Sequence, residues 1–443
     1  MKVVVIGGVA AGMSAASKIK RIDESAEVIV YEKGGFLSYG ACGLPYYVGG
    51  FNDDHTKMIA RTREQFEKTG IKTRLYHEIL KVVPQEKQIL VRNHETGDVF
   101  IDNYDKLMIA TGAAALKPPL EGIDKKGVYQ LKTMEDGLRL KELANNPDIK
   151  KVVIVGGGYI GIESVDAFLH LGKQVTCIEF ADRILMPFDE EISKLAKEEL
   201  LSKGAQLKMG ERVVAIKGAE HVTSVATDKG EYEADLVILS IGVRPSTEFL
   251  KDTGIHMAPN GALIVDREMR TSIADIWGAG DCSMVYHKGL KENSFLPLGT
   301  VANKCGRIAG DNIMGSHTKF IGALGSAAIK VCDVELGRTG LGEADAKRLG
   351  MNYKTVMIEA YDHPGYYPDQ TPIYIKLIYE TGTKKLLGAQ TAGKKGAVLR
   401  VDVFAVAIHN EMTTDELGMT DLVYAPPFAG VWDAIHIACN AAK

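Results

Sequence analysis

Two segments of the chain repeat one pattern of apolar and polar positions. Residues 2–6 (KVVVI) and 151–155 (KVVIV) are short Val/Ile runs. Each is followed by closely spaced glycines, a stretch with helical spacing and a second apolar run that ends in a glutamate. We expect a strand, a helix and a second strand in each copy. The fully apolar strands are typical of a parallel sheet that is covered on both faces.

The two copies also align in register, because at an offset of 149 residues Gly7 falls on Gly156 and Gly12 on Gly161. Glycines in such a turn bring backbone N–H groups against a pyrophosphate at the start of a helix. The acid that ends the second strand accepts a hydrogen bond from a ribose hydroxyl. The acids in these positions are Glu32 and Glu179. The repeat therefore predicts two dinucleotide sites, an arrangement typical of an electron relay between FAD and a nicotinamide cofactor.

Beyond residue 320 the pattern changes. Residues 372–390 (PIYIKLIYETGTKKLLGAQ) alternate with the period of a strand, and residues 403–419 (VFAVAIHNEMTTDELGM) have the spacing of a helix. Strands followed by helices, outside both nucleotide-binding units, indicate an α+β module.

Composition narrows the class of protein. A length of 443 residues suits about three domains, and a net charge of −4 shows no bias towards nucleic acid. No stretch approaches the roughly 18 apolar residues that span a membrane. The six cysteines are scattered, without a CxxC pair or a Cys/His cluster at metal spacing. We expect a cytoplasmic enzyme without a metal, a nucleic-acid partner or a membrane partner.

Two further segments carry a resemblance to a known family. Residues 104–119 (YDKLMIATGAAALKPP) and 274–283 (ADIWGAGDCS) each read as a strand that enters a turn of small residues. With the repeat, they make the chain resemble the pyridine nucleotide-disulfide oxidoreductases. The resemblance implies an α/β fold with two Rossmann-like domains and a C-terminal α+β dimerisation domain. The implied ranges are 1–114 with 244–318 for FAD, 115–243 for NAD(P)H, and 319–443 for dimerisation.

The resemblance also implies which residues bind each cofactor. The expected FAD contacts lie in the first glycine turn, at the glutamate that ends the second apolar run, in the two turns of small residues, and shortly after the second of these turns. They are Gly7, Gly12, Glu32, Thr111, Gly112, Asp281 and Thr300. The expected NADH or NADPH contacts are Gly156, Gly158, Tyr159, Ile160, Gly161, Glu163 and Glu179. A carboxylate at Glu179 favours the free 2′-hydroxyl of NADH, although Arg183 could still serve a 2′-phosphate.

Cys42 is the candidate redox residue. In SYGACGLPYY it precedes Gly43 and Pro45, a composition that predicts the start of a helix. Unpaired N–H groups and the helix dipole are expected to lower the pKa of its thiol. No second cysteine lies five positions away on either side, so the resemblance is to the single-cysteine branch of the family. We expect the other five cysteines to serve only in packing.

Members of that branch reduce coenzyme A disulfide or act as NADH oxidases and peroxidases. The oxidases and peroxidases carry a histidine in the first glycine turn, where this chain has Ala10, and a bulky residue where it has Gly40. By resemblance, Tyr366 and Tyr424 come from the partner subunit of a homodimer and help to protonate departing CoA. The neighbouring Tyr367 is a less favoured alternative to Tyr366. The implied CoA contacts are Ser14, Lys18, Arg21, Ser38 and Asn303.

The sequence therefore favours a flavoprotein that reduces CoA disulfide to two CoA with NAD(P)H, through a Cys42–S–S–CoA mixed disulfide. An NADH oxidase or peroxidase, with Cys42 cycling through sulfenic acid, is one alternative. Reduction of CoA persulfide or polysulfide is another, and a flavin carrier that reduces a protein partner without using Cys42 is the third.

Overall fold

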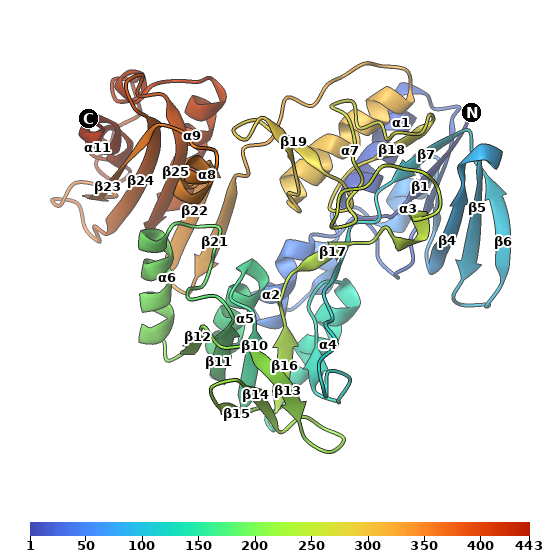
Figure 1. The fold of residues 1–443 in the computed structure, drawn as a ribbon, viewed down its shortest axis with the longest axis horizontal. Helices are drawn as coiled ribbons and strands as arrows, with labels where there is room; N and C mark the ends of the chain where they lie inside the picture. Colours follow the sequence, from blue (N-terminus) through green and yellow to red (C-terminus); the bar gives the residue numbers. More distant parts are fainter.

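The computed structural model describes all residues from 1 to 443, and Figure 1 shows three units. The first is built on a parallel sheet whose strand order is β18-β7-β1-β2-β3. Its strands are β1 (Lys2–Ile6), β2 (Glu27–Tyr31), β3 (Ile71–Arg74), β7 (Lys106–Ile109) and β18 (Ile276–Gly278). All four Val and Ile side chains of β1 are buried, as expected for a strand covered on both faces.

Helices cover one face of this first sheet. They are α1 (Ala10–Ile22) and α7 (Gly299–Ile313), which pack against each other. A three-stranded antiparallel sheet shares the same hydrophobic core. Its strands are β4 (His77–Val83), β5 (Gln88–Asn93) and β6 (Val99–Asn103). The short helix α3 (Arg63–Glu67) and the hairpin of β19 (Val285–His287) and β20 (Glu292–Ser294) complete this unit. The short helix α2 (Leu44–Val48) packs into the core of the second unit.

The second unit repeats the strand–turn–helix arrangement. Its parallel sheet has the order β12-β11-β10-β16-β9. The strands are β9 (Val128–Tyr129), β10 (Lys151–Val155), β11 (Gln174–Glu179), β12 (Gln206–Met209) and β16 (Leu236–Leu239). Its helices are α4 (Met134–Asn145), α5 (Tyr159–His170) and α6 (Glu190–Ser202), and an antiparallel sheet is formed by β13 (Val213–Lys217), β14 (Ser224–Thr227) and β15 (Glu231–Glu233).

The chain passes twice between these units through one two-stranded ribbon. Strand β8 (Ala113–Ala115) leads into the second unit, and β17 (Val243–Pro245) returns beside it in the antiparallel sense. The boundaries expected at residues 114 and 244 both fall within this ribbon.

The third unit is a five-stranded antiparallel sheet with helices. Its order is β21-β22-β25-β24-β23. The strands are β21 (Ala327–Val331), β22 (Val334–Gly340), β23 (Tyr353–Tyr361), β24 (Pro372–Glu380) and β25 (Leu386–Gly393), and the helices are α8 (Glu343–Arg348), α9 (Ala397–His409), α10 (Thr414–Leu417) and α11 (Ala434–Ala441). The helical spacing over 403–419 is interrupted, because α9 ends at His409 and α10 begins at Thr414.

The alternation expected in β24 is present, but both of its faces are covered. Ile373, Ile375 and Leu377 share a core with residues of α9 and α11, whereas Tyr374 packs against the core of the second unit. Lys376 also lies on that second face and is almost completely buried. The third unit therefore packs against the nucleotide-binding part of the chain. No helix of the structure combines the length and the apolar character needed to cross a lipid bilayer.

Candidate active site

The two glycine turns have the same geometry. Gly7 and Gly156 have φ angles of 101° and 110°, which disfavour any other residue. A Cβ atom on Gly12 would lie 1.9 Å from the carbonyl oxygen of Gly7, and one on Gly161 would lie 1.9 Å from that of Gly156. In each turn the later glycine therefore permits the helix to pack closely on the preceding strand.

The acids at the ends of β2 and β11 each hold their own glycine turn. Glu32 accepts hydrogen bonds from the backbone N–H groups of Gly8, at 2.8 Å, and Gly34, at 2.7 Å. Glu179 does the same with Gly157, at 2.5 Å, and Ala181, at 2.7 Å. A carboxylate has about four acceptor positions, so each acid retains positions for ribose hydroxyls. Burial raises the pKa of Glu32, and the two N–H donors oppose that effect.

The first unit has the groups that FAD requires. The hydroxyl of Thr111 is buried without a hydrogen-bond partner, and Gly112 beside it has a φ angle of 65°. Asp281 forms an ion pair with Lys132, at 3.2 Å, and Thr300 is exposed in the first turn of α7. These groups fit FAD. The buried hydroxyl of Thr111 is free to bond to the cofactor, and Gly112 and Asp281 follow two neighbouring parallel strands, β7 and β18.

The second unit fits a nicotinamide cofactor. A Cβ atom on Gly158 would meet no other atom within 4 Å, so open space lies in front of the middle glycine of the turn. Ile160 and Tyr159 begin α5. The phenol of Tyr159 is buried without a partner, and burial raises its pKa to about 12.

Glu163 lies one turn further along α5. Burial is the main cause that raises the pKa of its carboxyl to about 7, and the charge of Asp166 adds to the increase. Tyr46 donates a hydrogen bond to Glu163 at 3.4 Å, which acts in the opposite direction. Glu163 therefore changes its charge near neutral pH.

Cys42 lies in a short 3-10 turn (Ala41–Gly43) directly before α2, which has a proline in its first turn. The helix start predicted here is therefore present, but the predicted effect on the thiol is wrong. Burial of the thiol against the protein raises its pKa, and the negative charge of Glu163 adds to the effect, while Lys132 opposes it only in part. α2 has only five residues, and its dipole does not offset this loss of water.

The other cysteines differ from Cys42 in their surroundings. Cys42 is exposed, Cys332 is half-buried and the remaining four are buried: Cys177, Cys282, Cys305 and Cys439. Burial raises the pKa of the Cys332 thiol to about 12. An outside thiol must reach the sulfur in order to react, so Cys42, as the exposed cysteine, is the best placed of the six.

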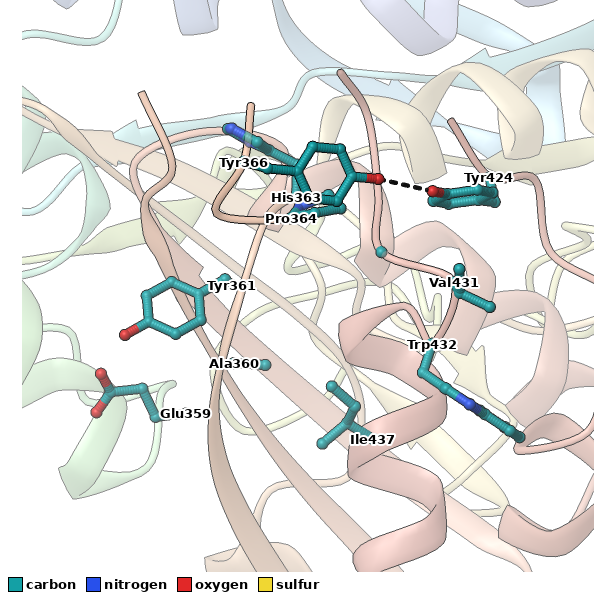
Figure 2. Close-up of a pocket in the computed structure, with 11 residues that line it drawn as sticks. Glu359, Ala360, Tyr361, His363, Pro364, Tyr366, Tyr424, Val431, Trp432 and Ile437 are labelled. Atoms are coloured by element: carbon teal, nitrogen blue, oxygen red, sulfur yellow. Dashed lines mark hydrogen bonds between the residues drawn. The ribbon is translucent and has the colours of Figure 1, made fainter. Parts of the chain in front are cut away.

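Tyr366 and Tyr424 come together on the third unit. Their hydroxyl oxygens lie 2.9 Å apart (Figure 2). Both residues line a cavity of about 500 Å³ that also includes His363, Val431 and Trp432. Tyr367 instead packs against the ring of His363, with ring centroids 5.5 Å apart, so Tyr366 is the tyrosine that pairs with Tyr424.

Within one chain the tyrosine pair is remote from Cys42. Figure 1 shows β23 and β24, whose connection carries Tyr366, at the opposite side of the molecule from α1, and shows α2, which follows Cys42 in the sequence, between the first two units. The structure of a single chain therefore does not bring the three expected catalytic residues together.

The residues expected to contact CoA lie on α1, α7 and the segment before Cys42. Ser14 donates a hydrogen bond to Asn303 at 2.8 Å, so these two face each other between the helices. Lys18 forms an ion pair with Asp311 at 3.0 Å, and Arg21 is exposed at the end of α1. Ser38 has a φ angle of 48° and donates its backbone N–H to Gly8, at 2.9 Å, which places it beside the first glycine turn.

Sequence reasoning did not single out two residues of this region. Tyr46, the partner of Glu163, lies four residues after Cys42, a helical spacing that could have identified it. Lys132, which contacts Asp281 and affects the Cys42 thiol, precedes α4 in a segment without any pattern that marks it.

The chain matches the model of the pyridine nucleotide-disulphide oxidoreductase family over residues 1–299 and the model of that family's dimerisation domain over residues 326–435. An NAD(P)H coenzyme A polysulfide/persulfide reductase from Pyrococcus horikoshii is 38% identical over 443 residues, which cover 100% of this chain and 98% of that one. An NADH oxidase from Enterococcus faecalis is 33% identical, over 100% of this chain and 99% of the other.

Solved structures agree with this assignment. The structure of reduced CoADR-RHD from Bacillus anthracis superposes with a TM-score of 0.96 at 33% identity, covering 99% of this chain and 79% of the other. The expected α/β fold with a C-terminal dimerisation domain is confirmed. The two nucleotide-binding units, the two glycine turns and these matches together show that the chain belongs to the pyridine nucleotide-disulphide oxidoreductase family, whose members are FAD- and NAD(P)H-dependent enzymes.

Proposed function

We propose that the protein is a homodimeric NAD(P)H-dependent reductase of CoA disulfide. The observation that carries the proposal is the state of Cys42, which is free and exposed while the other five cysteines are buried or half-buried. A single reactive cysteine forms its disulfide with a thiol from outside the chain. The polysulfide/persulfide reductase and the CoADR-RHD structure, both similar over nearly the whole of this chain, support CoA as that thiol.

The chain's own groups provide the steps around Cys42. Its thiolate attacks CoA disulfide, which forms the Cys42–S–S–CoA bond and releases one CoA thiolate. The Tyr366 and Tyr424 pair of the second subunit protonates that thiolate. FAD, when bound, would supply an electron pair taken from NAD(P)H. That one pair, with a second proton, returns the mixed disulfide to the Cys42 thiolate and a second CoA. NADH is the better substrate, because the carboxylate of Glu179 repels a 2′-phosphate.

Mass spectrometry of the intact protein tests the proposal. We expect the oxidised protein to lose the mass of CoA when it is reduced, and Cys42→Ser to show neither that loss nor turnover of CoA disulfide. The matched control is Cys332→Ser, which removes the half-buried thiol and keeps both properties. Turnover by Cys42→Ser at the wild-type rate would contradict the proposal, and would favour a flavin carrier that reduces a partner protein.

An NADH oxidase is the second candidate, since the similar protein from Enterococcus faecalis has that activity. The first glycine turn opposes it, because Ala10 provides no acid or base near a sulfenic acid at Cys42. An oxygen-sized adduct on Cys42, with oxygen consumption that exceeds CoA-disulfide turnover, would favour the oxidase. If CoA persulfide were turned over faster than CoA disulfide, Cys42 would keep its role, and only the molecule that reacts with it would differ.

A further inference from the structure

The two tyrosines that pair on the third unit lie on separate loops. Tyr366 is in the connection of β23 and β24, and Tyr424 is in the segment between α10 and α11. Their side chains are 73% and 45% exposed, so their own packing does little to fix them. For two exposed side chains to keep their hydroxyl oxygens 2.9 Å apart, the backbone segments that carry them must be held in place by other residues.

The loop that carries Tyr366 is closed by its own hydrogen bonds. The carboxylate of Asp362 accepts bonds from the backbone N–H of Thr371, at 2.8 Å, and from its hydroxyl, at 3.2 Å. The ring of His363 bonds to the carbonyl oxygen of Pro368, at 2.9 Å. Residues 362–371 therefore form a unit that is held at its base.

The segment that carries Tyr424 is fixed at the start of α11. The carboxylate of Asp433 caps that helix by accepting a bond from the N–H of Ile435, at 2.9 Å. The ring of His436 bonds to the carbonyl oxygen of Thr420, at 2.8 Å. Neither set of bonds connects this segment to the loop of Tyr366.

Arg400, near the start of α9, makes that connection. Its Nη2 atom donates to the carbonyl oxygen of Asp362, at 3.0 Å, and to that of Phe428, at 3.4 Å. The guanidinium also forms an ion pair with Asp433, whose closest contact is 2.7 Å. Both side chains of this pair are about nine-tenths buried. The guanidinium of Arg400 thus contacts both of the segments that carry the tyrosines.

We propose that Arg400 is a positioning residue for the proposed CoA chemistry, because it fixes the loops of Tyr366 and Tyr424 so that their hydroxyls meet. The role rests on the proposed function only for its effect on turnover. An arginine is suited to it because the planar guanidinium has five donors in a fixed arrangement, whereas a lysine would satisfy Asp433 as a point charge and leave the two carbonyl groups unbonded.

Arg400→Lys tests the proposal, with Arg348→Lys as the matched control. Arg348 belongs to the same unit and contacts only Glu292 and Asp345, in exposed ion pairs. A fluorotyrosine at position 366 of the FAD-loaded dimer reports phenol ionisation by 19F NMR. The hydrogen bond with Tyr424 raises the pKa of Tyr366. We expect both Arg400→Lys and Tyr424→Phe to move its titration to lower pH, and Arg348→Lys to leave it unchanged.

The turnover of CoA disulfide distinguishes the positioning role of Arg400 from the proposed catalytic role of the tyrosines. General acid groups typically contribute about 100-fold or more to a rate, and a displaced pair retains part of that effect. We expect kcat for CoA disulfide to fall about tenfold in Arg400→Lys, with the KM for NADH unchanged. A shifted titration with unchanged kcat would support the positioning role and contradict the proposed role of the tyrosines.

A second variant covers the case in which Arg400→Lys does not fold. Asp433→Asn keeps the guanidinium and removes the charge that holds it, and it retains an oxygen that can cap α11. We expect its 19F titration to move in the same direction by a smaller amount. A titration that matches wild type in every folded variant of Arg400 and Asp433 would overturn the proposal.

Discussion

Three charged side chains act on the thiol of Cys42. Glu163 and Asp281 raise its pKa, and Lys132 lowers it. Of the two acids, Glu163 has a carboxyl pKa raised to about 7, so its charge changes near neutral pH. Tyr46 donates a hydrogen bond to the carboxyl of Glu163. The protonation of Cys42 is therefore linked to that of a residue in the second nucleotide-binding unit.

Glu163→Gln is expected to lower the pKa of the Cys42 thiol. Below about pH 7 the wild-type carboxyl is neutral, so the two proteins should behave alike. Above that pH the wild-type carboxylate disfavours the thiolate, and the variant lacks this effect. The rate of Cys42 alkylation by iodoacetamide, followed as a function of pH, measures the difference. Glu198→Gln, on the exposed side of α6, is the control, and identical curves above pH 8 would contradict the prediction.

Gly158 and Gly161 are expected to differ when each is changed to alanine. A methyl group at position 158 meets no protein atom, so Gly158→Ala should fold and retain FAD but raise the KM for NADH about tenfold by occupying the space for the pyrophosphate. A methyl group at position 161 would collide with the Gly156 carbonyl and should reduce the yield of folded protein. Flavin absorbance and steady-state kinetics measure both effects. An unchanged KM in Gly158→Ala would show that the cofactor does not pass in front of that turn.

At the scale of elements, β24 connects the third unit to the second through Lys376. Its ammonium group lies 3.2 Å from Asp189 and 2.8 Å from both Glu191 and Glu343. Hydrogen bonds to the two glutamates outweigh burial and raise the pKa of the lysine. The ion-pair contribution is therefore fully present below the pKa of an unfolded lysine, about 10.4, and is lost at higher pH.

Lys376→Met is expected to reduce the free energy of unfolding by about 3 kcal/mol at pH 7, because removal of one partner leaves carboxylates of the cluster without a counter-ion. Lys384→Met, in the turn between β24 and β25, is the matched control. Its ion pair with Asp415 is largely exposed, and its loss should cost less than about 1 kcal/mol. Denaturant unfolding of both variants measures the difference, and equal values would show that the buried cluster is not a stabilising junction.

The elements differ in how far the sequence could predict them. The strands β1 and β10 and their glycine turns are local features, so a pattern of apolar residues and glycines identifies them. Lys376 in β24 reads as a solvent-facing position, because its counter-ions come from α6 and α8, far away in sequence. The raised pKa of Cys42 and the central place of Arg400 depend in the same way on tertiary contacts that no local pattern records.

At the scale of the molecule, the proposed roles of Cys42 and the tyrosine pair require an active site built from two subunits, because the two lie on different units of one chain. Mixed dimers test this arrangement. A dimer of one Cys42→Ser chain and one chain with Tyr366→Phe and Tyr424→Phe has one intact site if the tyrosines act across the interface. We expect about half of the wild-type turnover from it, whereas each parental homodimer is almost inactive.

The matched control places all three substitutions on one chain and pairs it with a wild-type chain. Both of its sites are then defective if the tyrosines come from the partner, and one is intact if they do not. Activity in this control together with its absence in the first mixture would contradict the two-subunit site. Differently tagged chains, purified as mixed dimers, allow the comparison.

The chain leaves the first unit through β8 and returns to it through β17, and this connectivity also affects the order in which the two parallel sheets form. The first sheet needs β18, at Ile276–Gly278, beside β7, whereas every strand of the second sheet lies between residues 128 and 239 (Figure 1). During synthesis at about 5–20 residues per second, the ribosome takes roughly ten to thirty seconds to proceed from β7 to β18. A nascent chain therefore has every strand of its second parallel sheet before β18 leaves the exit tunnel and completes the first sheet.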